Sequence, residues 1–208
     1  MFFKTFTYST LVHICPHQVM KLLSFFSAFL LIVPALAVWP RPQNMTIGMT
    51  PLRLSSDFSI RTSGIRQVPQ DLSDAIHRSS NYLKADKLGA LVPDRGASSA
   101  RKVSSAHSLQ SLILSLESGL GQLQSISDGA IAGLGVTDET YTLEIPVNGE
   151  NATLTARSAL GLFRGLKTFE QLWFYIDGTT YTLQAPIQIQ DAPAYVGGLH
   201  SPQCSDLY

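Results

Sequence analysis

The sequence predicts an α+β fold in which two helices pack on a mainly antiparallel β-sheet. Several short segments alternate apolar and polar residues, as strands with one buried face do. Two longer segments repeat apolar residues at the spacing of an amphipathic helix. The chain has 208 residues, of which 45% are hydrophobic. That length suffices for one domain with a buried core, but it cannot also hold a barrel of about 250 residues.

The first half of the domain contributes one predicted strand and one predicted helix. Loose alternation predicts a strand over Leu52–Ile60. A helix is predicted over Asp71–Leu83, because Pro69 precedes the segment, Gly89 follows it and its apolar residues recur at helical spacing. Val92–His107 is polar and rich in serine, so we expect a loop there.

Three further strands are predicted downstream. Leu109–Glu117 carries leucines at every second position, and Tyr141–Ile145 and Ala152–Ala156 each alternate apolar with polar residues. Asn148 and Gly149 lie between the last two segments, and both residue types tolerate the positive φ of a type I′ turn. We therefore expect these two strands to pair as an antiparallel hairpin.

A second helix is predicted over Arg157–Trp173, followed by two short strands at Tyr181–Leu183 and Ile187–Ile189. Gly161 and Gly165 lie inside this helix, where each costs about 1 kcal/mol relative to alanine. Two such glycines indicate that the helix backbone approaches a neighbour closely, either the sheet or another domain. The apolar side of the helix consists of Ala159, Leu162, Phe163, Leu166, Phe169 and Trp173.

Residues 1–37 are predicted to be an N-terminal extension plus a signal peptide. From Met20 the chain has a lysine, an apolar run over Leu22–Val33 and the small-residue motif Ala35-Leu36-Ala37, which are the three parts of a secretory signal. The run is shorter than the roughly 20 apolar residues of a membrane span, and Pro34 interrupts it. We therefore expect a secreted protein without a membrane anchor.

The charge of the remaining chain argues against polyanionic partners. Lys4 and Lys21 are the charged residues before residue 38, so 13 basic and 15 acidic residues follow, a net charge of −2 with neutral histidines. Nucleic acid and anionic lipid both attract a basic surface, so neither is an expected partner. Cys15 and Cys204 both lie outside the predicted domain, so the sequence predicts no disulfide framework.

Two segments carry a resemblance to a known family. Arg157–Tyr175 and Pro186–Tyr195 resemble the end of the N-terminal domain of secreted eukaryotic β-N-acetylhexosaminidases, glycosidases that remove terminal N-acetylhexosamine residues from carbohydrates such as chitin oligosaccharides. The resemblance is densest over 137–194 and departs at Val196. It implies a zincin-like, non-catalytic domain over residues 38–195, followed by a divergent tail over 196–208. Its implied partner is the catalytic barrel of the parent enzyme.

Asp138 and Glu139 are adjacent acids of the type with which that family catalyses. In the resembled enzymes the aspartate orients the acetamido group of the substrate and the glutamate protonates the leaving oxygen. Here the pair follows Gly135-Val136-Thr137 and leads into the strand at Tyr141, which matches the strand entry of the N-terminal domain. We interpret it as a solvated turn and expect no catalytic residue in this chain.

No cofactor or metal site is predicted. The resembled domain has the fold of a zinc protease without its metal, and the motif His-Glu-x-x-His is absent. His77, His107 and His200 are scattered without ligand spacing, and Ser158 lacks the context of a catalytic serine.

Two N-glycosylation sequons are present, at Asn151 and Asn44. Behind a signal peptide such sequons become credible acceptors. Asn151 directly follows the predicted hairpin turn, where a glycan meets solvent, so it is the preferred site.

Two functions remain open from the sequence. The first is a non-catalytic domain that supports a barrel and is inactive alone, with self-association possible through the surface that the barrel covers. The alternative is a secreted binding or regulatory module that attaches to full-length enzyme or to glycan. Such a module needs an exposed aromatic platform, for which Trp173, Phe174 and Tyr175 are the candidates, although periodicity places Trp173 in the core.

Overall fold

The computed structural model describes residues 38–117, 123–132, 136 and 138–192. These residues all belong to one compact unit of the chain, Ala37–Tyr208. The predicted extension and signal peptide over 1–37, and the tail over 196–208, lie outside the described residues.

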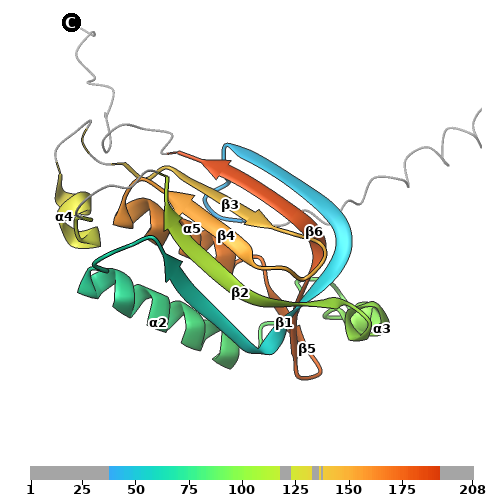
Figure 1. Ribbon diagram of the computed structural model, residues 1–208. Coiled ribbons are helices and arrows are strands. Elements are labelled where there is room, and N and C mark those ends of the chain that lie inside the picture. Colours follow the sequence, from blue (N-terminus) through green and yellow to red (C-terminus); the bar gives the residue numbers. More distant parts are fainter. Residues whose placement is uncertain (1–37, 118–122, 133–135, 137, 193–208) are drawn as a thin grey trace, which may run out of the picture. The chain divides into compact units, whose positions relative to one another are not determined.

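A six-stranded sheet forms the centre of the domain (Figure 1). Its order is β1-β2-β4-β3-β6-β5, and β1 also pairs with β6, so five strands form a closed circuit of pairings. The predicted α+β fold is confirmed. Four of the described pairings are antiparallel, while β1–β2 and β2–β4 are parallel, so the sheet is mixed. The strands are β1 (Asn44–Ser63), β2 (His107–Leu116), β3 (Tyr141–Ile145), β4 (Ala152–Ala156), β5 (Phe174–Ile176) and β6 (Thr179–Asp191).

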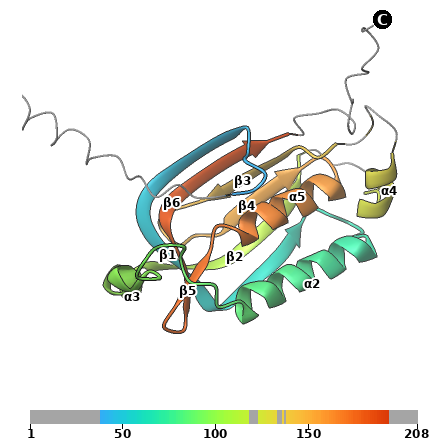
Figure 2. The same cartoon turned by 180° about the vertical axis from the view of Figure 1, so that it is seen from behind.

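Two helices, α2 (Gln70–Ala85) and α5 (Ala159–Glu170), cover the same face of the sheet (Figure 2). Both confirm predicted helices. The parallel pairing of β1 with β2 follows from α2, because a chain that returns parallel to its first strand needs a long crossover connection. Ser158 caps α5 by accepting a hydrogen bond from the Gly161 amide over 2.9 Å, which explains why this serine stands there.

The two faces of the sheet differ in polarity. Leu114, Leu154, Leu143 and Ile189 stand side by side on neighbouring strands and are at most 1% exposed. One residue further along each strand, the side chains point the other way. That neighbouring row is polar: Ser115, Thr155, Thr142 and Gln190.

The two glycines of α5 allow the helix to approach the sheet closely. A Cβ on Gly161 would lie 2.5 Å from the carbonyl oxygen of Thr140, and one on Gly165 would overlap the Leu154 side chain. Both neighbours belong to the sheet or its entry. The sequence left open whether α5 approaches the sheet or another domain, and the structure shows that it approaches the sheet.

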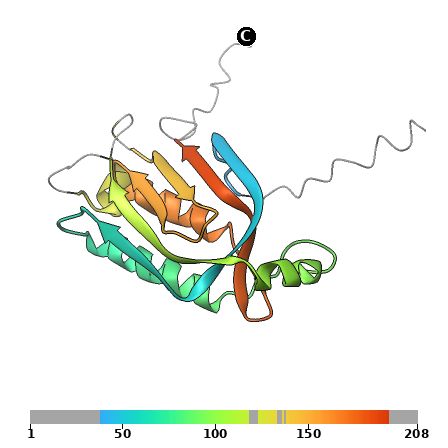
Figure 3. The same ribbon diagram turned by 45° about the vertical axis from the view of Figure 1, so that its right-hand side comes forward.

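Three local predictions are wrong. The segment predicted as a loop over Val92–His107 contains a 3₁₀ turn, η1 (Ala97–Ser99), and a short helix, α3 (Ala100–Ser104) (Figure 3). The two predicted strands after α5 are one strand, β6. The β3–β4 pair is antiparallel as predicted, but a six-residue connection joins the strands and only Gly149 in it has positive φ, so the turn is not type I′. A further short helix, α4 (Ile126–Ile131), precedes β3.

Tyr141 joins α5 to the end of β6 through its buried hydroxyl. The hydroxyl forms a 2.6 Å hydrogen bond with the Thr168 hydroxyl and donates over 3.3 Å to a carboxylate oxygen of Asp191. Burial raises the pKa of Tyr141 to about 12; the Thr168 hydrogen bond opposes that rise and the negative charge of Asp191 adds to it.

We expect Tyr141 to make the domain sensitive to alkaline pH. A raised folded pKa contributes stability below the ordinary tyrosine pKa of about 10, and that stability is lost as pH rises toward 12. Tyr141→Phe should cost about 1 kcal/mol at pH 8, where it removes the hydrogen bonds. The difference between the two proteins should close by about pH 11, because only the wild type loses stability through this group. Urea unfolding at both pH values measures it, and an unchanged difference would contradict the assignment.

Candidate functional site

Asp138 and Glu139, the adjacent acids, form structural contacts at the entry to β3. The Asp138 carboxylate accepts a 2.9 Å hydrogen bond from the Thr140 amide, and its backbone carbonyl accepts one from the Ser158 hydroxyl. The Glu139 carboxylate accepts two hydrogen bonds from Arg164, at 2.8 and 3.2 Å. The Asp138 carboxylate is therefore bound within its own segment and the Glu139 carboxylate is in an ion pair with α5. Both residues are half-buried, where the sequence predicted a solvated turn.

The histidines of the described residues are separate surface residues. His77 is exposed on α2 and His107 is exposed at the start of β2. His200 lies outside the described residues. No cluster of three or more histidine, cysteine, aspartate or glutamate residues that could hold a metal ion occurs in the part of the chain that the structure describes.

Both sequon asparagines are exposed. Asn44 begins β1 and stands opposite Gln190 of β6. Asn151 precedes β4, and its side-chain oxygen accepts a 2.6 Å hydrogen bond from the buried hydroxyl of Ser111. That bond uses the amide oxygen, whereas a glycan is attached through the amide nitrogen.

The three candidate platform aromatics do not form one exposed surface. Trp173 is only 5% exposed, and its ring packs against Phe169 at a centroid distance of 5.4 Å, so periodicity placed it correctly in the core. Phe174 packs against Tyr181. Tyr175 is half-buried, and the Lys87 ammonium lies 5.7 Å from the centre of its ring.

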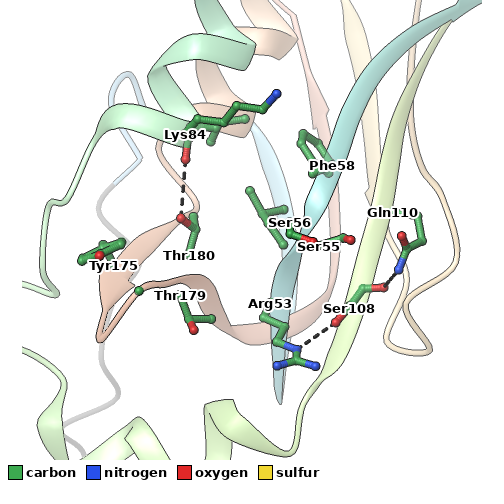
Figure 4. A pocket seen from close by; sticks show the side chains of 13 residues that line it. Arg53, Ser55, Ser56, Phe58, Lys84, Ser108, Gln110, Tyr175, Thr179 and Thr180 are labelled. Atoms are coloured by element: carbon green, nitrogen blue, oxygen red, sulfur yellow. Dashed lines mark hydrogen bonds between the residues drawn. The ribbon is translucent and has the colours of Figure 1, made fainter.

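A cleft lies where β1 and β6 diverge, and we call it the β1–β6 cleft (Figure 4). It has a volume of about 560 Å³, within the range of small-ligand sites. Sequence reasoning missed it, because its walls come from segments far apart in the chain. The lining comprises Arg53, Leu54, Ser55, Ser56, Phe58, Leu83, Lys84, Ser108, Gln110, Tyr175, Gly178, Thr179 and Thr180.

A second pocket, of about 370 Å³, lies beside α5 at the end of β6. The Gln171 side chain holds the backbone of Trp39 there from both sides, accepting from its amide at 2.7 Å and donating to its carbonyl at 3.0 Å. Gln43 in turn binds Asp191 and Ala192. The beginning and the end of the described domain are therefore fastened together next to α5.

Exposed apolar side chains are scattered over the described surface. Trp39, Met49, Leu91, Ile131 and Val136 each expose more than 70% of their surface. They come from different segments, and the outward side of α5 carries the charged residues Arg164 and Lys167. None of the helices in the described residues combines the length and hydrophobicity that crossing a membrane requires.

Comparison with known proteins connects these features to one family. A family model described as beta-acetyl hexosaminidase like matches residues 38–172. A curated beta-hexosaminidase of Arthroderma benhamiae is 39% identical over 59 residues, which cover 28% of this chain and 10% of the relative.

A solved structure shows the same fold. The chitobiase of Flavobacterium johnsoniae is 22% identical with a TM-score of 0.50, over 76% of this chain and 21% of the chitobiase. An N-acetyl-beta-hexosaminidase of Streptomyces plicatus, in complex with Thio-NAglucal, is 22% identical with a TM-score of 0.40, over 74% of this chain and 26% of that enzyme. The chain thus spans about a fifth of the chitobiase.

Proposed function

The chain belongs to the beta-acetyl hexosaminidase-like family and has its N-terminal domain, and from this premise we propose that the domain is a non-catalytic support for the catalytic barrel of a secreted β-N-acetylhexosaminidase. One observation carries the proposal. Asp138 and Glu139, the adjacent acids that match the family's catalytic residue types, are bound to the Thr140 amide and to Arg164, so neither projects freely toward a substrate.

The position of α5 supports the same role. Its inner side is fixed to the sheet through Gly161 and Gly165, whereas Arg164 and Lys167 on its outer side are 51% and 45% exposed. The second pocket, which both Trp39 and Asp191 line, lies beside this helix. We infer that the barrel packs against the outer side of α5, next to the point where β6 ends.

Co-secretion tests the supporting role. The catalytic part of the Arthroderma benhamiae relative would be secreted with and without this chain, and its hydrolytic activity in the medium measured. We expect this chain to raise the activity and the double variant Arg164→Glu/Lys167→Glu to abolish that gain. Glu144→Lys, an exposed charge reversal on β3, should leave it intact. Equal activity with and without the chain would refute the proposal.

We further propose that the chain is secreted and N-glycosylated, with Asn151 the principal site. Its exposure at the β3–β4 connection supports the assignment. Thr153→Ala destroys the sequon but keeps Asn151 and its hydrogen bond with Ser111. We expect this variant to lose one glycan mass in intact-protein mass spectrometry, and Thr46→Ala to reveal any occupancy of Asn44. An unchanged mass for Thr153→Ala would exclude Asn151.

The alternative of a binding module with an aromatic platform receives no support from Trp173, which is buried.

A further inference from the structure

We propose that the β1–β6 cleft binds an anionic saccharide, that is, a sugar that carries a sulfate ester or a carboxylate. This inference is independent of the supporting role proposed above. It depends on the shape of the cleft, on its charge and on the chemistry of its lining.

The cleft arises because β1 changes partners. Arg53 pairs with Tyr181 of β6 and with Ser108 of β2, and beyond it β6 turns away toward β5. The β1–β2 register then shifts between Leu54 and Ser59. Of the four residues between them, Ser55, Ser56 and Phe58 line the cleft, and none of the four has a partner in the β1–β2 register.

The cleft is positively charged. Its lining includes Arg53 and Lys84 and no aspartate or glutamate. Arg53 donates from Nε to the Ser108 hydroxyl over 2.8 Å, which orients the guanidinium and leaves its other N–H groups available. Within the described residues, neither Arg53 nor Lys84 forms an ion pair with a carboxylate. Two unneutralised cations in one cleft favour an anionic ligand.

The rest of the lining suits a sugar. Lys84 lies above and Arg53 below in the view of Figure 4, and the polar side chains of Ser55 and Ser56 lie at a height between them. Thr179 also lines the cleft. Hydroxyl groups can both donate to and accept from the hydroxyls of a saccharide. Tyr175 adds a half-buried aromatic ring to the same cleft.

The floor of the cleft is rigid. Phe58 is 4% exposed and stacks on Phe169 of α5 at a centroid distance of 5.9 Å, with the rings inclined by 10°. The Thr180 hydroxyl donates to the Leu83 carbonyl at the end of α2 over 3.5 Å. A ligand therefore meets side chains attached to the packed core rather than to a free loop.

Isothermal titration calorimetry on the full secreted chain tests the proposal. The probes are a chondroitin 6-sulfate tetrasaccharide, a hyaluronan tetrasaccharide that carries carboxylates only, neutral chitotetraose and inorganic sulfate. We expect at least one acidic tetrasaccharide to bind, chitotetraose to bind at least about tenfold more weakly, and higher ionic strength to weaken the acidic complex. A preference for the sulfated or the carboxylated probe identifies the acidic group. Binding of sulfate alone would show that the saccharide part is not recognised and would refute the proposal.

Arg53→Gln and Lys84→Gln should each weaken binding of the acidic tetrasaccharide by about tenfold or more. The matched control is Arg61→Gln, because Arg61 lies on the same strand, also donates to a serine hydroxyl, at 3.0 Å, and lies outside the cleft. Lys84 is exposed, so its substitution keeps the test valid if Arg53→Gln fails to fold. Failure of both acidic tetrasaccharides to bind, equal binding of chitotetraose, or an equal loss in Arg61→Gln would each overturn the proposal.

Discussion

Phe169→Ala should lower the free energy of unfolding by about 3–5 kcal/mol, the largest effect we expect from a single substitution in this domain. Phe169 is fully buried on the sheet side of α5. It stacks on Phe58 of β1 and lies 5.4 Å from the Trp173 ring, so it connects the helix, the sheet and the chain beyond α5. Alanine would leave a cavity between these rings, and the Phe58 ring, which is held by β1, cannot collapse fully into it.

Phe163 provides the matched control on the same helix. It is half-buried, and the Lys167 ammonium lies 5.8 Å from the centre of its ring on the outer side. Phe163→Ala should cost only about 1–2 kcal/mol, because less apolar surface leaves the interior. Urea unfolding followed by circular dichroism measures both variants. Equal losses would show that Phe169 does not occupy the position described.

Gly161→Ala should destabilise the domain by about 1–2 kcal/mol, although alanine is the better helix former. The helix propensity alone favours alanine by about 1 kcal/mol. A Cβ at residue 161, however, would lie 2.5 Å from the Thr140 carbonyl oxygen and 3.0 Å from the Ala156 Cβ. Thr140 is at the entry to β3 and Ala156 is in β4, so α5 must move outward, and such overpacking costs about 1–3 kcal/mol.

For Gly129 of α4, we expect the opposite effect of alanine on stability. A Cβ at residue 129 would be 3.6 Å from the nearest neighbouring atom, the Cβ of Leu160, which is an ordinary contact. Gly129→Ala should therefore leave stability unchanged or raise it by up to about 1 kcal/mol. If both glycine substitutions stabilised the domain, the close contact between α5 and the sheet would be wrong.

Local pattern predicted the elements whose environment is uniform along their length. Tyr141–Ile145 and Ala152–Ala156 are β3 and β4 to the residue, because both lie inside the sheet with one face buried under α5. The helix prediction placed Trp173 in the core even though α5 ends at Glu170. The helical spacing of apolar residues therefore predicts burial correctly for a few residues beyond the helix, because the chain there still packs against the same surface.

The strand bounds that the local sequence pattern missed depend on pairing with residues far away in the chain. The predicted strand Leu52–Ile60 is only the middle of β1, because Asn44–Ile47 is extended by pairing with β6 and not by its own alternation. Two separate strands were predicted, one on each side of Pro186. Instead it is exposed within β6 where the β1 register shifts, so the missing amide hydrogen does not interrupt the strand.

The candidate sites also differ in whether local sequence pattern could predict them. The pairing of Glu139 with Arg164 joins residues 25 positions apart, but the position of the acids just before a strand already indicated a turn. The β1–β6 cleft had no such signal. Arg53, Lys84 and Thr179 are brought together only by the divergence of β1 from β6, which no local pattern contains.

The central claim is that this domain contributes no sugar-cleaving group, and hydrolysis of a chromogenic N-acetylglucosaminide by the purified full chain tests it most directly. We predict release of chromophore at the rate of a protein-free blank, with the same rate for Asp138→Asn and Glu139→Gln. Turnover above the blank that disappears in either variant would contradict the claim.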